Sequence, residues 1–219
     1  METAVSSPYR DAIDHLPPGG MLVVNDVTWE EYEHLLEELS DRPGVRVTYD
    51  QGRLQAVSPL RAHERYTQIL FDLADVTADF FELPFEPIGS TTLKQMTLQR
   101  GVEPDRAFYV TNAHRVENKI TLDLSSDPPP DVVIEVDLST DSWAKLPIYA
   151  AMGVPEIWLF NGKRMQILEL GTDRAHYSSV SQSRFIPPLT ITVFEQQLEK
   201  GRTTGRTALL RSYRASLKP

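Results

Sequence analysis

The chain has 219 residues and a mass of 24.8 kDa, a length that suits one domain with extended tails. It contains no cysteine, which excludes disulfides, zinc–thiolate sites and thiol nucleophiles. The formal net charge of −9 argues against a large basic nucleic-acid footprint. No apolar run approaches the roughly 18 residues of a membrane span, and the N-terminus lacks a signal-peptide pattern, so we expect a cytoplasmic protein without a membrane partner.

The first part of the chain predicts a flexible segment, two helices and a hairpin. Residues 1–20 are rich in Pro, Ser and Gly and are expected to form a flexible N-terminal lead-in. Residues 27–39 have apolar residues at helical spacing, and Thr28 and Glu31 occupy the positions of a capping box. Residues 45–59 predict a β-hairpin that turns at Gln51-Gly52. A second amphipathic helix is expected from about residue 63 to 81.

The second part of the chain predicts mainly strands. They are expected near residues 87–98, 104–110, 131–138, 156–160 and 175–180. A helix between the third and fourth is expected to end at Met152, because Gly153 and then Pro155 follow it. Asn161-Gly162 lies between two apolar runs and predicts a hairpin with a type I′ turn.

A basic segment ends the chain. Residues 196–219 contain six cations and, from Lys200 onward, no acid; the cations are Lys200, Arg202, Arg206, Arg211, Arg214 and Lys218. We expect a basic C-terminal tail that either binds phosphates or is a solvated, partly disordered terminus. Residues 21–195 are expected to form the domain. The fold class is α/β or α+β, with a mixed β-sheet flanked by helices and added β-hairpins, because the strand–helix–strand unit at 131–160 favours parallel neighbours.

Carboxylates interrupt the apolar strand at 131–138. Alternation places Val132, Ile134, Val136 and Leu138 on one face and Asp131, Val133, Glu135 and Asp137 on the other. A buried ionised carboxylate costs several kcal/mol unless it is paired or bound to a cation. A divalent metal such as Mg²⁺ takes one or two carboxylates, and Asp105 could join Glu135 if its strand is the neighbour. The alternatives are an exposed edge or pairing with arginines such as Arg106; for Asp131 we favour one of these.

Three segments together resemble a known family. They are "VEPDRAFYV", "PPPDVVIEVDLS" and "AKLPIYAAMGVPEIWLFNG". Their combination resembles the Uma family of predicted restriction endonucleases, formerly a domain of unknown function, in the PD-(D/E)XK nuclease superfamily. The resemblance covers roughly residues 22–195 and implies a restriction-endonuclease-like core.

The resemblance also implies roles for individual residues. Asp105 and Glu135 match the two acidic metal ligands of the superfamily. Its lysine usually follows the second acid by two residues, where this chain has Asp137, so Asp137 is expected either to ligate metal or to neutralise a cation. Lys145 matches a basic residue common in the family and could extend back to the site, although it could equally be solvated or paired with Asp137. Glu64 and His63 match accessory positions; an acid in a first helical turn, or a capping or packing histidine, would explain them as well.

The resulting hypothesis is a Mg²⁺- or Mn²⁺-dependent endonuclease that hydrolyses DNA phosphodiester bonds, with catalytic residues Asp105, Glu135, Lys145 and Asp137. DNA contacts would come from local basic patches such as Arg61, Arg65, Lys94 and Arg100, or from the tail. The alternative is a catalytically weak or inactive homodimer of the same fold that acts as a binding or assembly module. No Gly-x-Ser-x-Gly, phosphate-loop or dinucleotide-binding motif occurs.

Overall fold

The computed structural model describes residues 7–40, 44–138 and 142–218. The chain divides into two compact units. Unit 1 comprises residues 1–60 and 92–103, and unit 2 comprises residues 61–91 and 104–219. The single domain expected over residues 21–195 therefore contains parts of both units.

Unit 1 consists of a five-stranded sheet and two helices. The strand order is β1-β3-β2-β6-β5. The elements are α1 (Arg10–Asp14), β1 (Met21–Val24), α2 (Trp29–Leu39), β2 (Arg46–Asp50), β3 (Arg53–Val57), β5 (Leu93–Gln95), the 3-10 helix η1 (Met96–Leu98) and β6 (Arg100–Val102). The expected helix is present with a complete capping box between Thr28 and Glu31. The lead-in is folded in part, because α1 places Ile13 in the core of the unit.

The hairpin of unit 1 has the expected turn. Asp50 pairs with Arg53, which leaves Gln51 and Gly52 as the two turn residues. Both have positive φ, +48° and +95°, as a type I′ turn requires. Gln51 adopts this conformation although it is not a glycine, because a two-residue turn of this type needs a positive φ at both positions.

Unit 2 contains a six-stranded mixed sheet in the order β11-β10-β9-β8-β7-β4. Only β8 and β9 are parallel, and the helix between them supplies the crossover, as expected. The strands are β4 (Glu86–Gly89), β7 (Arg106–Tyr109), β8 (Val132–Val136), β9 (Glu156–Phe160), β10 (Met165–Leu170) and β11 (Tyr177–Val180). The helices are α3 (Arg61–Phe80), α4 (Ala113–Val116), the 3-10 helix η2 (Ser142–Lys145), α5 (Leu146–Met152), α6 (Ile191–Thr203) and α7 (Arg206–Ser216).

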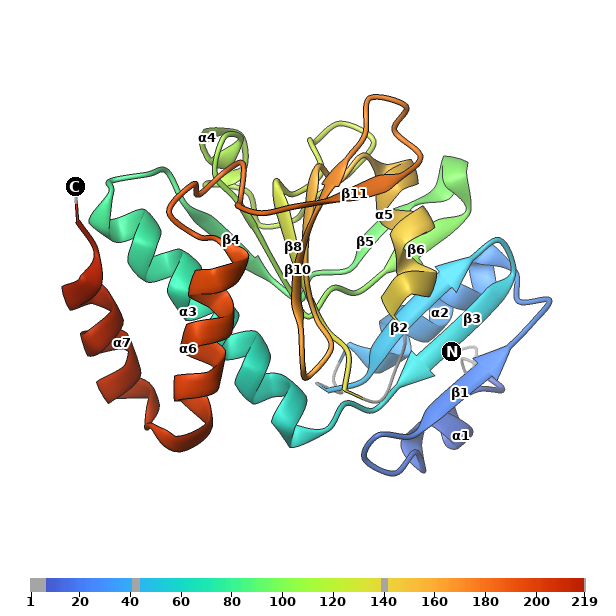
Figure 1. The fold of residues 1–219 in the computed structure, drawn as a ribbon. Coiled ribbons are helices and arrows are strands. Elements are labelled where there is room, and N and C mark those ends of the chain that lie inside the picture. The colour runs from blue at the N-terminus through green and yellow to red at the C-terminus, as the bar shows by residue number, and fades with distance from the viewer. Residues whose placement is uncertain (1–6, 41–43, 139–141, 219) are drawn as a thin grey trace. The chain divides into compact units, whose positions relative to one another are not determined.

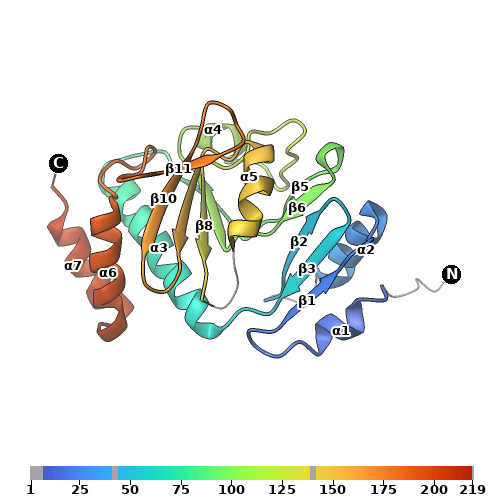
Figure 2. The same cartoon turned by 45° about the vertical axis from the view of Figure 1, so that its right-hand side comes forward.

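The sheet of unit 2 has helices on both faces (Figures 1 and 2). Helices α3, α6 and α7 cover one face, where Val132, Ile134 and Val136 of β8 enter the main apolar core. The short helix α5 lies against the other face. Glu135 belongs to this second face by alternation, so the fold places a carboxylate beneath α5.

Two local expectations are wrong. The strand expected at 87–98 is divided: β4 pairs in the sheet of unit 2, β5 in the sheet of unit 1, and Gly89 with a φ of +64° lies at the break. The Asn161-Gly162 hairpin exists, but Phe160 pairs with Met165, which leaves a loop of residues 161–164. The Oδ1 atom of Asn161 accepts from the backbone N–H groups of Lys163 and Arg164, so this side chain closes the loop.

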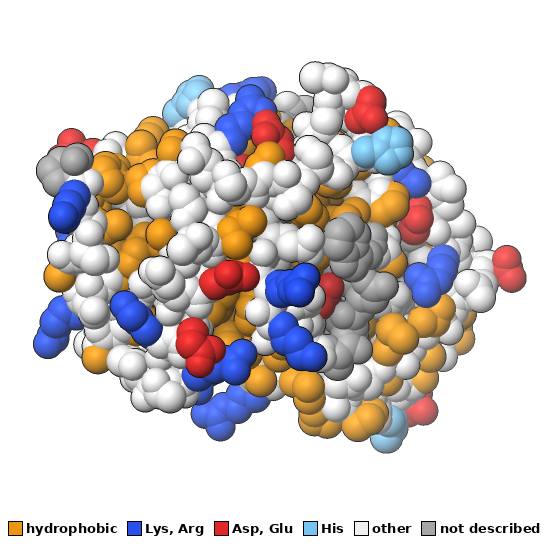
Figure 3. All heavy atoms as spheres, viewed as in Figure 1, with side chains coloured by type: hydrophobic (Ala, Val, Ile, Leu, Met, Phe, Trp, Pro, Cys, Tyr) orange, Lys and Arg blue, Asp and Glu red, His pale blue; other side chains and the backbone are white. Residues whose placement is uncertain are grey.

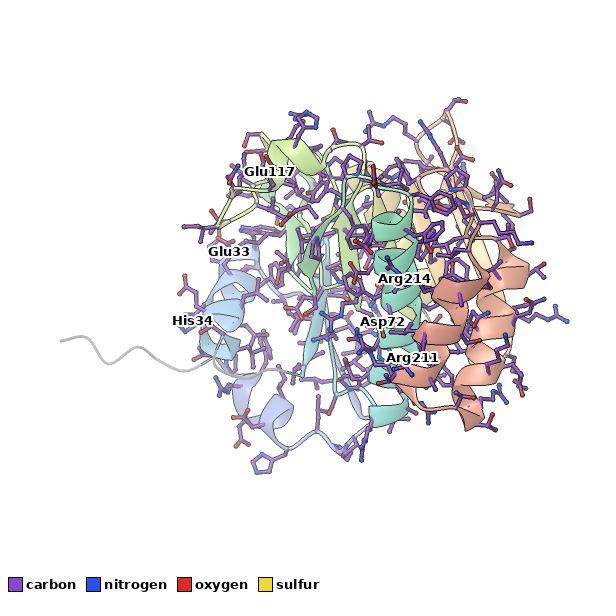
Figure 4. All side chains as sticks on the ribbon, turned by 90° about the vertical axis from the view of Figure 1, so that its left-hand side faces the viewer. Glu33, His34, Asp72, Glu117, Arg211 and Arg214 are labelled. Atoms are coloured by element: carbon purple, nitrogen blue, oxygen red, sulfur yellow. The ribbon has the colours of Figure 1, made fainter. Side chains whose placement is uncertain are left out.

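The C-terminal segment is helical and packed rather than a solvated tail. The boundary expected at residue 195 falls inside α6, and α6 and α7 both contact α3. Leu209 and Tyr213 of α7 are buried in the main core. Basic residues of α7 pair with acids of α3: Arg206 with Asp72 at 2.6 Å and Arg214 with Asp79 at 2.6 Å. Figure 4 labels Asp72 and Arg214 where the two helices lie side by side.

The docking of α7 gives a stability prediction. Leu209 is 1% exposed, so Leu209→Ala is expected to lower the free energy of unfolding by about 2–5 kcal/mol through lost burial and a residual cavity. Arg211→Ala, at an exposed position of the same helix, should change it by less than about 0.5 kcal/mol. Urea unfolding of both variants measures the two values. Equal stability of the variants would mean that α7 contributes nothing to the core.

Candidate active site

Asp105 and Glu135 lie opposite each other on neighbouring strands of unit 2. β7 and β8 are antiparallel, with Arg106 paired to Ile134, so continuation of the register places residue 105 beside residue 135. Cross-strand partners project to the same face of a sheet. The side chains are buried, at 3% and 1% exposure, and burial, together with the negative charge of Asp105, raises the pKa of Glu135. The two acids expected to converge are therefore neighbours in one buried region.

Glu135 is held by two residues around the start of α5. The Nζ atom of Lys145 donates to both of its carboxylate oxygens, at 3.0 and 2.8 Å. The hydroxyl of Tyr149 donates to Oε1 of Glu135. Lys145 is the N-cap residue of α5 and Pro147 occupies its first turn, where a missing N–H costs nothing. The lysine side chain thus extends from the helix start to the strand, as the sequence suggested it could.

Asp105 is held by the backbone of β8 and by α3. Its Oδ2 atom accepts from the backbone N–H of Val136 at 2.7 Å. The same oxygen lies 2.9 Å from Nε2 of His63, which is buried in the first turns of α3. The Nδ1 atom of His63 is buried and has no hydrogen-bond partner among the residues that the structure describes. His63 therefore orients Asp105 through one ring nitrogen.

Burial and the charges of the site compete in setting its pKa values, and burial prevails at Glu135, whose pKa is raised. Burial acts to raise the pKa of Asp105, but the hydrogen bond from His63 and the charge of Lys145 outweigh it and lower the pKa. Burial acts to lower the pKa of Lys145, and the charges of Glu135 and Asp105 reverse this, so the pKa of the ammonium is raised. The pKa of His63 is raised for the same reason, because its bond to Asp105 overcomes burial. The pKa values of Asp105, Lys145 and His63 are thus all shifted toward the charged forms of these side chains.

Three further acids from the sequence analysis have different environments in the structure. Asp137 follows β8, donates its backbone N–H to the carbonyl of Phe160 at 2.8 Å, and its charge contributes to the raised pKa of Lys145. Glu64 is exposed in the first turn of α3, and its charge acts on the neighbouring His63. Asp131 is buried and accepts from the backbone N–H groups of Val110 and Asn112, so it closes the turn after β7.

Tyr149 is a site residue that sequence reasoning missed. It is fully buried, and its hydroxyl contacts the carboxylate of Glu135. A signal for it exists in the sequence, because Tyr149 follows Lys145 by four residues and residues at this spacing share a helix face. Burial, together with the charge of Glu135, raises its pKa well above the ordinary range of a tyrosine, so the hydroxyl stays a donor.

The acids of this region fit a divalent cation in part. Both hydrogen bonds of Asp105 given above end on Oδ2, which leaves Oδ1 as a hard oxygen donor for a cation. Mg²⁺ takes one or two carboxylates and completes its shell with water and phosphate oxygens. Over residues 7–40, 44–138 and 142–218, no group of three or more His, Asp or Glu is arranged to hold a metal ion. Ligation by Asp105, Glu135 and Asp137 together therefore stays a prediction.

Comparisons with known proteins agree with the sequence resemblance. A structural comparison matches a crystal structure from Anabaena variabilis ATCC 29413, described as a putative nuclease belonging to DUF820. The TM-score is 0.52 at 14% identity, over 74% of this chain and 97% of the other, which shows a shared nuclease-like fold. No protein with a curated description matches the sequence. No helix in the described part of the chain combines the length and the apolar composition needed to cross a bilayer. Residues 29–203 match the Uma2 family, described as "Putative restriction endonuclease", and the chain belongs to this family.

Proposed function

We propose that the protein is a metal-dependent endonuclease that hydrolyses phosphodiester bonds of DNA. The observation that carries the proposal is the buried group of Asp105, Glu135 and Lys145 at the ends of two adjacent strands. Family membership supports a nuclease function in general. Two neighbouring acids and a lysine are the groups that phosphodiester hydrolysis needs: oxygen ligands for a cation and a positive charge for the phosphate.

Each residue would have a separate task. Asp105 and Glu135 would hold the cation, with Asp137 as a further candidate ligand. Lys145 would move its ammonium from Glu135 to the scissile phosphate and stabilise the negative charge that develops there. His63 would keep Asp105 oriented, and Tyr149 would keep Glu135 oriented after Lys145 leaves it. Glu64 would act only through His63.

The chemistry of the cation is general. When bound, Mg²⁺ or Mn²⁺ neutralises phosphate charge and lowers the pKa of a coordinated water. The chain supplies no cysteine, and hard carboxylate oxygens favour these ions over softer metals.

The test is nicking of supercoiled plasmid DNA with Mg²⁺ or Mn²⁺. Wild-type protein is expected to nick, and Asp105→Asn to lose at least about 100-fold in rate because a ligand is removed from a preorganised site. Asp75→Asn, the same change at an exposed position of α3, should leave the rate unchanged. Calorimetry with Mn²⁺ alone should show binding to wild type and none to Glu135→Ala.

Two results would contradict the proposal. One is the absence of nicking by wild type with either cation. The other is equal nicking by wild type and Asp105→Asn, which would assign the activity to a contaminant. DNA binding that needs no metal and that survives Glu135→Ala, without any cleavage, would favour the alternative of a binding or assembly module.

A further inference from the structure

Several of the basic residues expected to contact DNA are already paired with acids of their own unit. In unit 1, Lys94 pairs with Glu33 and Arg100 with Asp50. In unit 2, Arg206 and Arg214 of α7 pair with Asp72 and Asp79 of α3. A cation that already has a carboxylate partner releases less free energy on meeting a phosphate. These residues are therefore weak candidates for a phosphate-binding surface.

Four other cations are exposed and gather at one end of unit 2. Arg61 and Arg65 lie on the first turns of α3, and Lys163 and Arg164 lie in the β9–β10 loop. Within the described residues, none of the four forms an ion pair with a carboxylate; Arg65 instead donates to the carbonyl of Gly201. We call these four residues the basic edge. In Figure 3, basic side chains, with some acidic ones between them, lie in the lower centre of the view, where Figure 1 places the start of α3 and the β9–β10 loop.

Specific contacts hold the segments of the basic edge together. The ring of Tyr66 on α3 packs against Phe160, the last residue of β9, with centroids 5.1 Å apart. The end of α6 binds both segments, since Gly201 accepts from Arg65 and Arg202 donates to the carbonyl of Gly162 at 3.2 Å. Arg202 is also paired with Glu199, so it links α6 to the β9–β10 loop and is not counted among the unpaired cations. The four cations are thus presented by a packed framework.

The basic edge adjoins the candidate active site. His63, which binds Asp105, lies between Arg61 and Arg65 in the same turns of α3. On the other side, a Cβ atom added to Gly162 would lie 3.0 Å from the side chain of Leu138, three residues after Glu135. The backbone of Asp137 bonds to that of Phe160, at the base of the loop. One segment of the edge is therefore linked to Asp105 through His63, and the other lies beside the end of β8 that carries Glu135.

The shape of the edge suits a phosphate backbone. A hollow of about 470 Å³ is lined by Arg61, Ala62, Arg65 and Tyr66. Arginine forks bind phosphate oxygens in bidentate geometry, and exposed cations release condensed counterions from DNA. Such a local patch resolves the conflict between a net charge of −9 and an anionic substrate.

We propose that the basic edge binds the phosphate backbone of a DNA duplex and positions it at Asp105 and Glu135. The proposal rests on the proposed function and adds where the substrate lies. The contacts are sequence-independent, because arginine and lysine bind phosphates without reading bases.

The experiment measures binding separately from cleavage. A fluorescein-labelled 20-base-pair duplex is titrated with protein in EDTA, and anisotropy is followed at several salt concentrations. Lys163→Glu/Arg164→Glu is expected to weaken binding about tenfold at 100 mM salt, and to reduce the slope of log K against log salt by about 2. Arg61→Ala, on the other segment, should reduce the slope by about 1.

Arg174→Glu is the matched control, because Arg174 is exposed in the loop at the opposite end of β10. It should bind as wild type does, and thermal unfolding of all variants verifies that they are folded. Wild-type binding with no loss in either edge variant would overturn the basic edge and leave the nuclease proposal intact. Edge-dependent binding without cleavage in Mg²⁺ or Mn²⁺ would support the edge and contradict hydrolysis. The absence of duplex binding by wild type would also overturn the basic edge, whereas the nuclease proposal is decided by nicking in Mg²⁺ or Mn²⁺.

Discussion

Lys145→Met is expected to lower the free energy of unfolding by about 3–5 kcal/mol in EDTA and to abolish nicking. The ammonium contacts both oxygens of Glu135, a side chain that is 1% exposed. Methionine keeps most of the volume of lysine but cannot donate a hydrogen bond. Of the two donors to Glu135 described above, Lys145 and Tyr149, only Tyr149 then remains, and the buried carboxylate still experiences the charge of Asp105. Removing one partner of a buried ion pair costs this much because the remaining charge is uncompensated.

The double variant Lys145→Met/Glu135→Gln separates pairing from packing. If the loss in Lys145→Met comes from the orphaned carboxylate, neutralising Glu135 should restore at least about 1 kcal/mol of stability. Activity should not return, because both the metal ligand and the phosphate-binding cation are then missing. Urea unfolding in EDTA provides the four values of the cycle.

Divalent metal supplies a second readout. Mg²⁺ or Mn²⁺ should stabilise Lys145→Met more than wild type, since a cation at Asp105 and Glu135 would replace the lost ammonium without having to displace it. A Lys145→Met protein as stable as wild type in EDTA would contradict the ion pair as a structural element. Equal stabilisation of both proteins by metal would contradict a cation site at Glu135.

The elements predicted well from the sequence are those determined by local interactions. The capping box of α2 and the Gln51-Gly52 turn each depend on residues within a few positions of one another. The Asn161-Gly162 turn was assigned wrongly because register depends on strand pairing, and Phe160 pairs with Met165 rather than with Lys163. The helix α7 was not predicted. Its buried residues Leu209 and Tyr213 are spaced i and i+4, but they are the only buried positions in a segment that is otherwise mostly exposed and basic, so the apolar pattern is weak.

The candidate site shows the same division. Strand alternation identified Glu135, and the end of α5 at Met152 followed from Gly153 and Pro155. The pairing of Asp105 with Glu135 needed a strand order that periodicity does not contain. The bond between His63 and Asp105 joins residues far apart in sequence and depends on how α3 packs. The family resemblance suggested roles for these residues, and the structure showed that they lie close together.

Glu156→Ala is expected to lower the free energy of unfolding by about 3–6 kcal/mol, although Glu156 lies outside the candidate site. It is fully buried on β9 and accepts from Nε1 of Trp158 at 2.6 Å, from Oγ of Ser183 at 2.6 Å and from the backbone N–H of Arg184 at 2.7 Å. Each donor left without an acceptor costs about 1–3 kcal/mol. The carboxylate thus anchors the segment after β11 to the sheet.

Glu156→Gln tests whether the negative charge matters as well as the size. All three partners are donors, and a glutamine amide offers one acceptor oxygen and a further donor group, so at least one bond becomes a donor–donor contact. The loss should be smaller than in Glu156→Ala, and it should be measurable by urea unfolding at neutral pH.

The pH dependence of that difference has a definite sign. Burial, opposed by the hydrogen bonds of Ser183, Arg184 and Trp158, raises the pKa of Glu156 above the ordinary value of 4.5. The folded protein therefore holds this proton at pH values where the unfolded chain has lost it, and the contribution of Glu156 to stability falls as the pH rises through its folded-state pKa. The stability advantage of wild type over Glu156→Gln should be larger at a pH near 4.5 than at neutral pH. An advantage that grows with pH would mean that the three donors outweigh burial and hold the pKa below its ordinary value.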